Sequence, residues 1–384
     1  MEHWFLDSEF PNSKAKHAAF HVIPFPLEET VSYMGGTAQG PQSLIEASSQ
    51  LEQLVEGYGN PGKLGIHTTE AIQCAKPVEQ ALQEATERML DAGRAGAIPV
   101  LLGGEHSVTN AAIAYLKEQH ANEAVGFLQF DAHMDLRFSY EGSKLSHASV
   151  MHRVVEAGFP LFQVGIRNFS EEDVQARNTF GVGHFDASAL YRSKLEGTFQ
   201  SLRLPGHFPH KLYITFDVDG LDAGLMSATG TPDPGGLAWW DAIMFLEQLT
   251  QDRSIVGFDV VELAPSVLHH PAYTAAKLTY FMMGLAAKRN AQLVCRSKSC
   301  LIRIILGDDW RGNQMCFGLQ GGLFPIFHPL PISPTIGTEE HHLAPRQVGK
   351  QAFEHWLEHL VFQSFGTHRR TSERKRVIAV QHIG

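Results

Sequence analysis

The chain has few of the features that mark secreted or membrane proteins. Four cysteines in 384 residues are too few for a disulfide framework, so stability has to come from a buried core. No run approaches the roughly 18 consecutive apolar residues that a membrane-spanning helix needs. The opening residues, MEHWFLDSEF, lack the basic and apolar regions of a secretory signal. We therefore expect a cytoplasmic protein with no membrane partner.

Positive charge is also scarce. The chain has 31 Lys and Arg against 41 Asp and Glu, for a formal net charge of −10. Affinity for nucleic acid comes mainly from clustered Lys and Arg, so this balance argues against a nucleic-acid partner. An acidic protein is better suited to a small cationic ligand. Charged residues at 19% are ordinary for a globular protein, which excludes disorder along the whole chain.

The composition changes near residue 290. From there on, 11 Lys and Arg outnumber 7 Asp and Glu, and three of the four cysteines and seven of the 21 histidines lie in this part. We therefore expect one catalytic domain over residues 1–290 and a C-terminal extension over residues 291–384 that is partly disordered. Within the extension, Leu301–Leu306 has the composition of a strand and Gln351–Phe362 that of a helix. A shifted reading frame is an alternative origin of the extension.

Before this boundary, strand-length apolar runs alternate with helical segments. The runs are rich in β-branched and aromatic residues and apolar on both faces, as buried parallel strands are. They are Ala19–Ile23, Ile98–Leu102, Val125–Phe130, Leu161–Ile166, Leu212–Phe216 and Ile255–Val261. The helical segments are Pro41–Leu54, Val78–Arg94, Val108–Gln119, His147–Ala157, Trp239–Leu249 and Tyr273–Lys288. This alternation predicts a three-layer α/β/α fold with a mostly parallel central sheet.

Acidic residues and histidines follow four of the predicted strands. They are His106, then Asp131, His133 and Asp135, then Asp217 and Asp219. In the last run, Asp259 follows Ile255–Phe258 and Glu262 stands at the end. Ligands of parallel sheets bind at the carboxyl ends of the strands. We therefore expect these side chains to face one crevice.

The spacing of these residues predicts a metal centre. In the D-x-H-x-D motif at residues 131–135 and the D-x-D motif at residues 217–219, alternate side chains point the same way if the backbone is extended. Four clustered carboxylates resist ionisation unless a cation neutralises them. With His106 the set exceeds what one divalent ion uses, so we expect two ions that share carboxylates. Mixed Asp and His ligation suits Mn²⁺, with Fe, Co, Ni or Zn as alternatives. Paired ions activate water at neutral pH, so hydrolysis is the predicted reaction class.

These motifs resemble those of the ureohydrolases, the family of arginases and agmatinases. The resemblance covers His21 to Arg289, and its motifs are GGEHS at 103–107, FDAHMD at 130–135, FDVDGLD at 216–222 and GFDVVELAP at 257–265. Within the family the chain looks most like a bacterial-type agmatinase, on the segments VSYMGGT at 31–37, YEGSKLSHA at 140–148 and ATGTPDPGGL at 228–237. The resemblance implies an arginase-like fold and assembly as a homo-oligomer, a trimer or a hexamer.

The resemblance also implies a role for each matching residue. One Mn²⁺ would be held by His106, Asp131, Asp135 and Asp217, and the other by Asp131, His133, Asp217 and Asp219. Glu262 matches the carboxylate that holds the guanidinium group of the substrate. His147 matches the histidine that passes a proton to the leaving amine, and we count His147, Glu262 and Asp135 as the catalytic residues. Activated hydroxide would attack the guanidinium carbon, giving urea and an amine.

The substrate that the resemblance favours is agmatine, which would yield putrescine in polyamine biosynthesis. The segment Leu136–Tyr140 lacks the small polar residues with which arginases read the α-carboxylate and α-amino group of arginine. Acidic residues frequent in agmatinases are replaced by Phe138 and Ser139, which leaves Glu141 as a nearby carboxylate. The alternatives are therefore the same chemistry on aminopropylagmatine, guanidinobutyrate, guanidine or arginine. From other classes, a metal-dependent deacetylase and a non-catalytic regulatory protein also remain.

Overall fold

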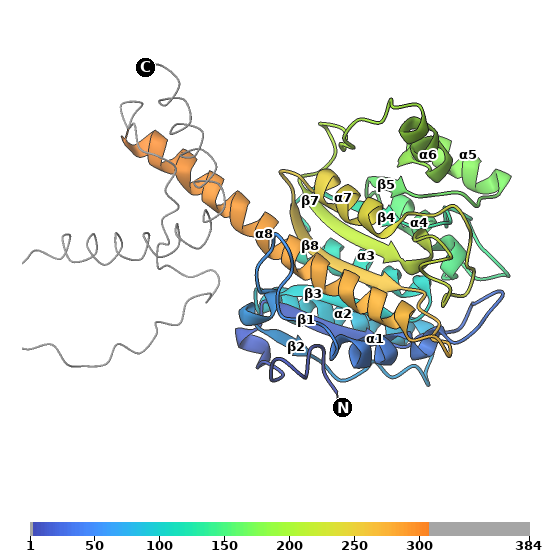
Figure 1. The fold of residues 1–384 in the computed structure, drawn as a ribbon, viewed down its shortest axis with the longest axis horizontal. Coiled ribbons are helices and arrows are strands. Elements are labelled where there is room, and N and C mark those ends of the chain that lie inside the picture. The colour runs from blue at the N-terminus through green and yellow to red at the C-terminus, as the bar shows by residue number, and fades with distance from the viewer. Residues whose placement is uncertain (1–2, 307–384) are drawn as a thin grey trace, which may run out of the picture. The chain divides into compact units, whose positions relative to one another are not determined.

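A single parallel sheet forms the centre of the protein. The fold comes from a computed structural model, which describes the backbone of residues 3–306 and the side chains of residues 3–292 (Figure 1). The strands are β1 (Phe20–Phe25), β2 (Ile66–Thr68), β3 (Ile98–Gly103), β4 (Val125–Phe130), β5 (Leu161–Val164), β6 (Gly183–Phe185), β7 (Lys211–Asp217) and β8 (Ser254–Val261). Their order in the sheet is β2, β1, β3, β8, β7, β4, β5 and β6, and every neighbouring pair is parallel.

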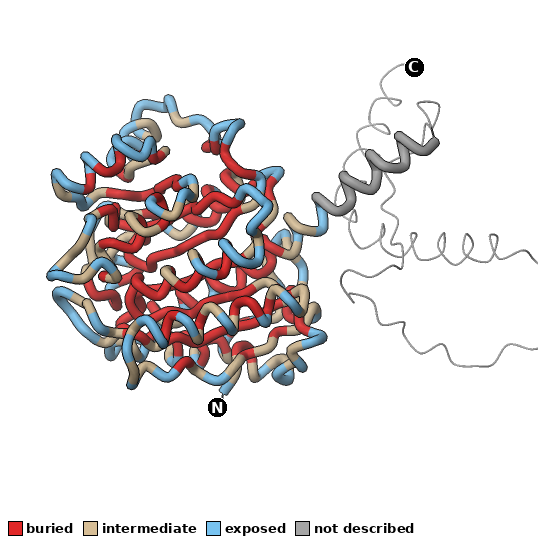
Figure 2. Tube along the Cα trace, turned by 180° about the vertical axis from the view of Figure 1, so that it is seen from behind, coloured by how far each residue is buried: buried red, intermediate tan, exposed pale blue. Residues whose placement is uncertain are grey.

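Helices cover both faces of this sheet (Figure 1). They are α1 (Gly40–Ser48), α2 (Val78–Arg94), α3 (Asn110–Gln119), α4 (Val150–Glu156), α5 (Glu171–Phe180), α6 (Ala187–Leu195), α7 (Trp239–Leu249) and α8 (His270–Leu306). Apolar residues of α1, α6, α7 and α8 belong to one core cluster, and those of α2 to α5 belong to the other. Successive residues of a strand point to opposite faces of the sheet and so join different core clusters. In β4, Leu128 and Phe130 belong to the first cluster and Phe127 to the second. The predicted three-layer α/β/α fold is thus confirmed, and Figure 2 shows the sheet buried between its helices.

Six of the eight strands lie where the sequence predicts them. The sequence did not predict the two edge strands, β2 and β6, or the helices α5 and α6. The last helix is longer than expected, because α8 continues unbroken to Leu306. A strand at Leu301–Leu306 is therefore wrong, since neither glycine nor proline occurs between Gly284 and Gly307 to end the helix. The predicted disorder of the extension and the helix at Gln351–Phe362 lie outside the described residues.

The order of the strands brings four strand ends together. β3, β8, β7 and β4 are neighbours at the centre of the sheet, although up to about 160 residues separate them along the chain. Phe130 of β4 pairs with Phe216 of β7, and their rings stack with centroids 5.0 Å apart. The next residues, Asp131 and Asp217, therefore leave the sheet side by side. No helix within the described part of the chain is long and apolar enough to cross a membrane.

Candidate metal centre

A cavity of about 240 Å³ opens at the carboxyl ends of the central strands. Seven of the site residues named from the sequence line it: His106, His133, Asp135, His147, Asp217, Asp219 and Glu262. The eighth, Asp131, is completely buried against them. The fold therefore brings all eight predicted metal and catalytic residues to one place.

Asp131 lies between two histidines. Its Oδ2 is 3.2 Å from Nδ1 of His106, and its Oδ1 is 3.6 Å from Nδ1 of His133. Each oxygen is also fixed by a donor, because the side-chain amide of Gln129 donates to Oδ2 at 2.7 Å and the main-chain amide of His133 donates to Oδ1 at 2.6 Å. A carboxylate held in this way, with one oxygen toward each imidazole, has the arrangement of a ligand shared by two cations.

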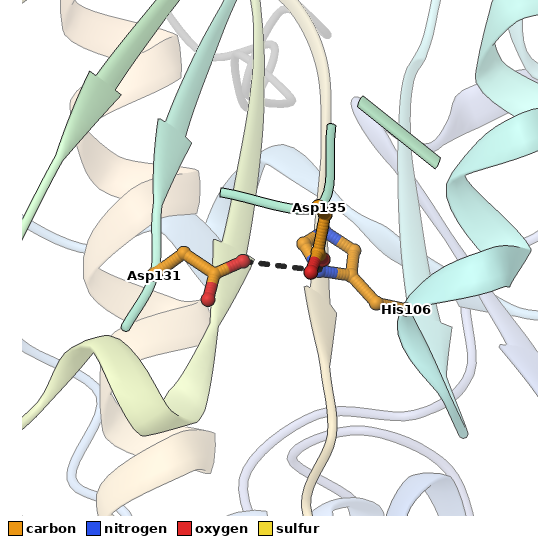
Figure 3. A group of neighbouring side chains, drawn as sticks. All are labelled: His106, Asp131 and Asp135. Atoms are coloured by element: carbon orange, nitrogen blue, oxygen red, sulfur yellow. Dashed lines mark ion pairs between the residues drawn. The ribbon is translucent and has the colours of Figure 1, made fainter. Parts of the chain in front are cut away.

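The first group of candidate ligands surrounds His106 (Figure 3). Its Nδ1 is 3.0 Å from Oδ2 of Asp135 and 3.3 Å from Oδ2 of Asp217, in addition to its contact with Asp131. This buried nitrogen makes no hydrogen bond of acceptable geometry with any of the three carboxylates. On the other side of the ring, Nε2 is 2.8 Å from the hydroxyl oxygen of Thr215. An imidazole nitrogen aimed between three carboxylates, and bonded to none, fits a metal ligand.

The second group joins His133 and Asp219 to Asp131. Nδ1 of His133 is 3.0 Å from Oδ2 of Asp219, whose Oδ1 accepts a hydrogen bond from the amide of Ala132 at 3.0 Å. Asp217 turns its Oδ1 to the amide of Asp219 at 2.9 Å and its Oδ2 to His106. Counting Asp131 itself, the two groups together supply four carboxylates and two imidazoles.

Without a bound cation, this cluster of buried carboxylates carries negative charge that is unfavourable. Burial and the neighbouring carboxylate of Asp131 raise the pKa of Asp135 to about 7. Burial and nearby acidic groups likewise raise the pKa of Asp217 well above its ordinary value. Burial opposes a charge on His106, but its three carboxylate neighbours outweigh that cost and raise its pKa. The protein alone thus favours extra protons here, and divalent cations supply the same positive charge.

Glu262 connects the cavity to the first ligand group. The main-chain amide of His106 donates a hydrogen bond to Oε1 of Glu262 at 2.6 Å. Burial raises the pKa of the Glu262 carboxyl to about 8, which a bound cationic group would reverse. Glu262 and Asp135 both have positive backbone dihedrals, with φ of 66° and 52°, a region that residues other than glycine rarely adopt. These strained positions turn two carboxylates into the site.

His147 begins a short 3₁₀ turn over His147–Ser149, which Ser146 caps. Its ring lies edge-on to Tyr140, with centroids 5.7 Å apart, and both residues line the cavity. Burial lowers the pKa of His147, although the nearby Glu105 carboxylate works in the opposite direction. A largely neutral imidazole beside the metal cluster is suited to accepting and returning a proton.

One predicted member of the crevice does not reach it. Asp259 is completely buried and does not line the cavity, so this prediction is wrong for Asp259. It lies within β8 rather than after it, opposite Leu101 and Thr215 in the neighbouring strands. Its Oδ2 instead accepts a hydrogen bond from the hydroxyl of Thr109 at 3.0 Å.

The cavity is also lined by Arg137, from the segment that the sequence links to the choice of substrate, and by Asp173, which sequence reasoning missed. Arg137 lines it, with Nε 3.9 Å from Oδ2 of Asp173, while Glu141 is exposed and does not line it. Asp173 is already engaged, because it accepts hydrogen bonds from the amide of Leu136 and from Ser170. The pattern of Ser170 followed three residues later by an acid is a helix capping box, which would have located Asp173 from the sequence.

Comparison with known proteins supports the same assignment. The Arginase family model matches residues 18–284. N(1)-aminopropylagmatine ureohydrolase of Thermus thermophilus is 37% identical over 69% of this chain and 89% of its own length. Agmatinase of Pyrococcus horikoshii is 32% identical over 74% of this chain and 97% of its own.

A solved structure agrees with these relatives. The agmatine ureohydrolase of Thermoplasma volcanium superposes with a TM-score of 0.66 at 27% identity, over 76% of this chain and 97% of that protein. The motifs at the strand ends, the parallel sheet and the matches to known proteins all indicate the same family. The chain belongs to the arginase family and is a ureohydrolase, a hydrolase of carbon–nitrogen bonds in guanidino groups.

Proposed function

We propose that this protein uses two Mn²⁺ ions to hydrolyse agmatine to putrescine and urea. The observation that carries the proposal is the place of Asp131, whose two oxygens face the two separate ligand groups of His106 and His133. A site for one metal needs no such sharing. Together with the family match, this arrangement favours two-metal hydrolysis over a deacetylase with one zinc.

The ligand sets of the proposal are those implied by the sequence. His106, Asp131, Asp135 and Asp217 would hold one ion, and Asp131, His133, Asp217 and Asp219 the other. A set of four carboxylates and two imidazoles suits Mn²⁺, which accepts both oxygen and nitrogen ligands. It does not suit Ca²⁺, which takes oxygen ligands. Paired divalent cations lower the pKa of water and polarise the group under attack.

Glu262 would bind the substrate guanidinium beside this centre. One of its oxygens is held by the amide of His106, which leaves Oε2 for the planar cation. Ionisation of the buried carboxyl and binding of the cation favour one another, because each removes the cost of burying the other alone. His147 would take a proton as water adds to the guanidinium carbon and give it to the leaving nitrogen.

The rest of the cavity lining bears on which guanidino compound is used. It includes Tyr33, Met34 and Phe169, which suit an alkyl chain. Two of the proteins named above are an aminopropylagmatine ureohydrolase and an agmatinase, so aminopropylagmatine is the second candidate. Arg137 is the observation that favours a third, guanidinobutyrate, because a cation at the cavity wall attracts a carboxylate.

The deciding experiment is urea release from a substrate panel by the full-length protein loaded with Mn²⁺. The panel contains agmatine, aminopropylagmatine, guanidinobutyrate, guanidine and arginine, compared by kcat/KM. We expect agmatine to be the best substrate. A higher kcat/KM for another member would replace the substrate, and urea from none of them would overturn the function. One zinc per purified chain, with release of acetate from acetylated amines, would establish the deacetylase instead.

Four further points of the proposal concern the setting of the enzyme. We propose a role in polyamine biosynthesis, a cytoplasmic location and a homo-oligomer, either a trimer or a hexamer. We also propose residues 1–290 as the catalytic domain, with residues 291–384 as an appendage. Light scattering on the full-length protein measures the oligomer directly, and a monomer would contradict it.

A further inference from the structure

Glu105 is a buried acid that the proposed chemistry does not use. It is completely buried and accepts four hydrogen bonds while donating none. Its Oε2 accepts from the main-chain amides of Glu29 at 2.7 Å and Thr30 at 2.6 Å. Its Oε1 accepts from the hydroxyl of Thr30 at 2.9 Å and from that of Ser107. All these partners are donors, which is the pattern of a carboxylate.

The approach of these two segments depends on glycine. A Cβ on Gly104 would lie only 2.0 Å from the carbonyl oxygen of Leu27, so a larger residue cannot occupy that position without moving the backbone. The amide of Glu105 donates to the same carbonyl at 2.8 Å. The turn after β3 is thereby packed against the segment after β1, and Glu105 reaches Thr30 across 75 residues of sequence.

Thr30 in turn contacts His147. The amide of His147 donates to the Thr30 hydroxyl oxygen at 3.0 Å, and Nδ1 of the His147 ring is 3.1 Å from the same oxygen. A hydroxyl has one hydrogen and two acceptor lone pairs. The carboxylate of Glu105 is the stronger acceptor, so the Thr30 hydrogen goes to Glu105. Nδ1 of His147 must then be the donor in its contact with Thr30.

We infer that Glu105 and Thr30 are positioning residues that hold neutral His147 as its Nδ1–H tautomer. The Ser146 hydroxyl is a weaker alternative partner, at 3.5 Å from Nδ1. With Nδ1 engaged, Nε2 is the ring nitrogen left with a free lone pair, and His147 lines the cavity.

This inference rests on the proposed function, because it says how His147 carries its proton. Nε2 accepts one proton as water adds to the guanidinium carbon, which makes the ring an imidazolium. Nε2 returns that proton to the leaving nitrogen as the carbon–nitrogen bond breaks. The hydroxyl group of the adduct gives up its own proton to the amine as the carbonyl of urea forms, and the products are urea and a protonated amine. The Nδ1–H bond to Thr30 is unchanged throughout, so the ring need not rotate between the two transfers.

Thr30 has two roles that need separating: its hydroxyl contacts the His147 ring, and its main-chain amide helps to bind the loop to Glu105. The variant that removes only the first is Thr30→Val. It removes the hydroxyl but keeps the shape of the side chain and both main-chain amides that bind Glu105. Thr30→Ser is the matched control, since it keeps the hydroxyl. We expect Thr30→Val to lower kcat at least about tenfold and Thr30→Ser to stay close to wild type, with little change in KM for either. Bound Mn²⁺ per chain should be the same in all three proteins.

A double-mutant cycle with His147→Asn tests whether Thr30 acts through the imidazole. We expect Thr30→Val to have no further effect on kcat when His147 is already replaced. An equal loss in both backgrounds would overturn the inference, and so would full activity of Thr30→Val.

The tautomer itself is read by nitrogen NMR of ¹⁵N-histidine-labelled protein loaded with diamagnetic Zn²⁺. The His147 signals are those missing from the His147→Asn variant. We expect a protonated Nδ1 in wild type and Thr30→Ser and its loss in Thr30→Val; a protonated Nε2 in wild type would overturn the inference. This measurement needs no substrate, so it stands even if the panel shows no urea and the proposed function fails.

Discussion

Glu262 receives a hydrogen bond at 2.6 Å from the main-chain amide of His106, a residue 156 positions earlier in the chain. The group proposed to bind the guanidinium is therefore fixed to the backbone of a proposed metal ligand. The two ends of this bond lie just after neighbouring strands, because His106 follows β3, Glu262 follows β8, and β8 lies beside β3 in the sheet. The relative position of substrate and metals is set by the fold rather than by a flexible loop.

Replacing Glu262 with glutamine should abolish most activity without unfolding the protein. The amide oxygen of glutamine still accepts the bond from His106, but the side chain no longer carries a negative charge for the guanidinium. We expect kcat/KM for urea release to fall about 100-fold to 1,000-fold. Thermal melting and Mn²⁺ content should remain as in the wild type. Retained activity would remove Glu262 from the substrate site.

Replacing Asp131 with asparagine should disturb both metals. The variant keeps an oxygen and the side-chain size but removes the charge that both ligand groups share. We expect Mn²⁺ affinity to weaken by more than about 100-fold, measured by metal analysis after equilibrium dialysis. Asp241→Asn is the control, because Asp241 pairs with Lys194 on the surface helices and should leave two ions per chain. Two tightly bound ions in Asp131→Asn would contradict the shared ligand.

The charge of Arg137 should tune the choice of substrate. Arg137 lines the cavity and is only partly compensated by Asp173, 3.9 Å away. Arg137→Gln removes a charge that repels the distal amine of agmatine and attracts the carboxylate of guanidinobutyrate. We expect the ratio of their kcat/KM values to shift toward agmatine by roughly fivefold to tenfold. An unchanged ratio would show that the far end of the substrate does not reach Arg137.

Glu28 provides a pH-dependent contribution to stability. Burial opposes its ionisation, but hydrogen bonds from Gly36, Thr37 and Ala38 outweigh that effect and lower its pKa below the usual 4.5. Its stabilisation is therefore complete above pH 4.5 and is lost as the pH falls through the lower folded-state pKa. We expect Glu28→Gln to cost about 1 kcal/mol at pH 7.

Urea unfolding at pH 7, 5 and 4 measures this contribution. The difference between wild type and Glu28→Gln should be constant down to about pH 5 and shrink at lower pH. Glu52→Gln, a change at an exposed residue, is the control and should show no such trend. A difference that grows toward acid would mean the sign is wrong.

Residues 307–384 of the C-terminal extension should be dispensable for the chemistry. Residues 307–384 lie beyond α8 and outside the region that the arginase family model matches. A chain ending at Leu306 should release urea within about twofold of the full-length protein, if the catalytic unit folds by itself. Loss of activity together with loss of bound Mn²⁺ would place the extension in the catalytic unit.

The central part of the fold could be predicted because its signals are strong. Six inner strands are continuous apolar runs, and β3, β4, β7 and β8 end at the motifs that carry the site. The edge strands β2 and β6 have three residues each and are partly exposed, so they carry no comparable run. The weakly amphipathic helix α5 is revealed by its capping box rather than by an apolar face.

In the site, too, one part could be predicted from the sequence and another could not. The candidate ligands stand in short motifs with a two-residue period, so the sequence shows which residues are close together. The contact of Glu105 with Thr30, and of Thr30 with His147, joins segments 75 and 117 residues apart. No local pattern contains such contacts, because they depend on how closely the turn after β3 approaches the turn after β1. The prediction for Asp259 failed for a different reason, since Asp259 lies inside β8 and its side chain bonds to Thr109 rather than facing the cavity.

The left-handed backbone at Asp135 and Glu262 implies a trade between folding and catalysis. Glycine at either position would relieve strain worth about 1 to 3 kcal/mol, at the loss of a carboxylate that the reaction needs. Selection for thermal resistance alone would therefore push both positions toward glycine. A stabilised variant that keeps Asp135 and Glu262 has to gain its stability elsewhere in the chain.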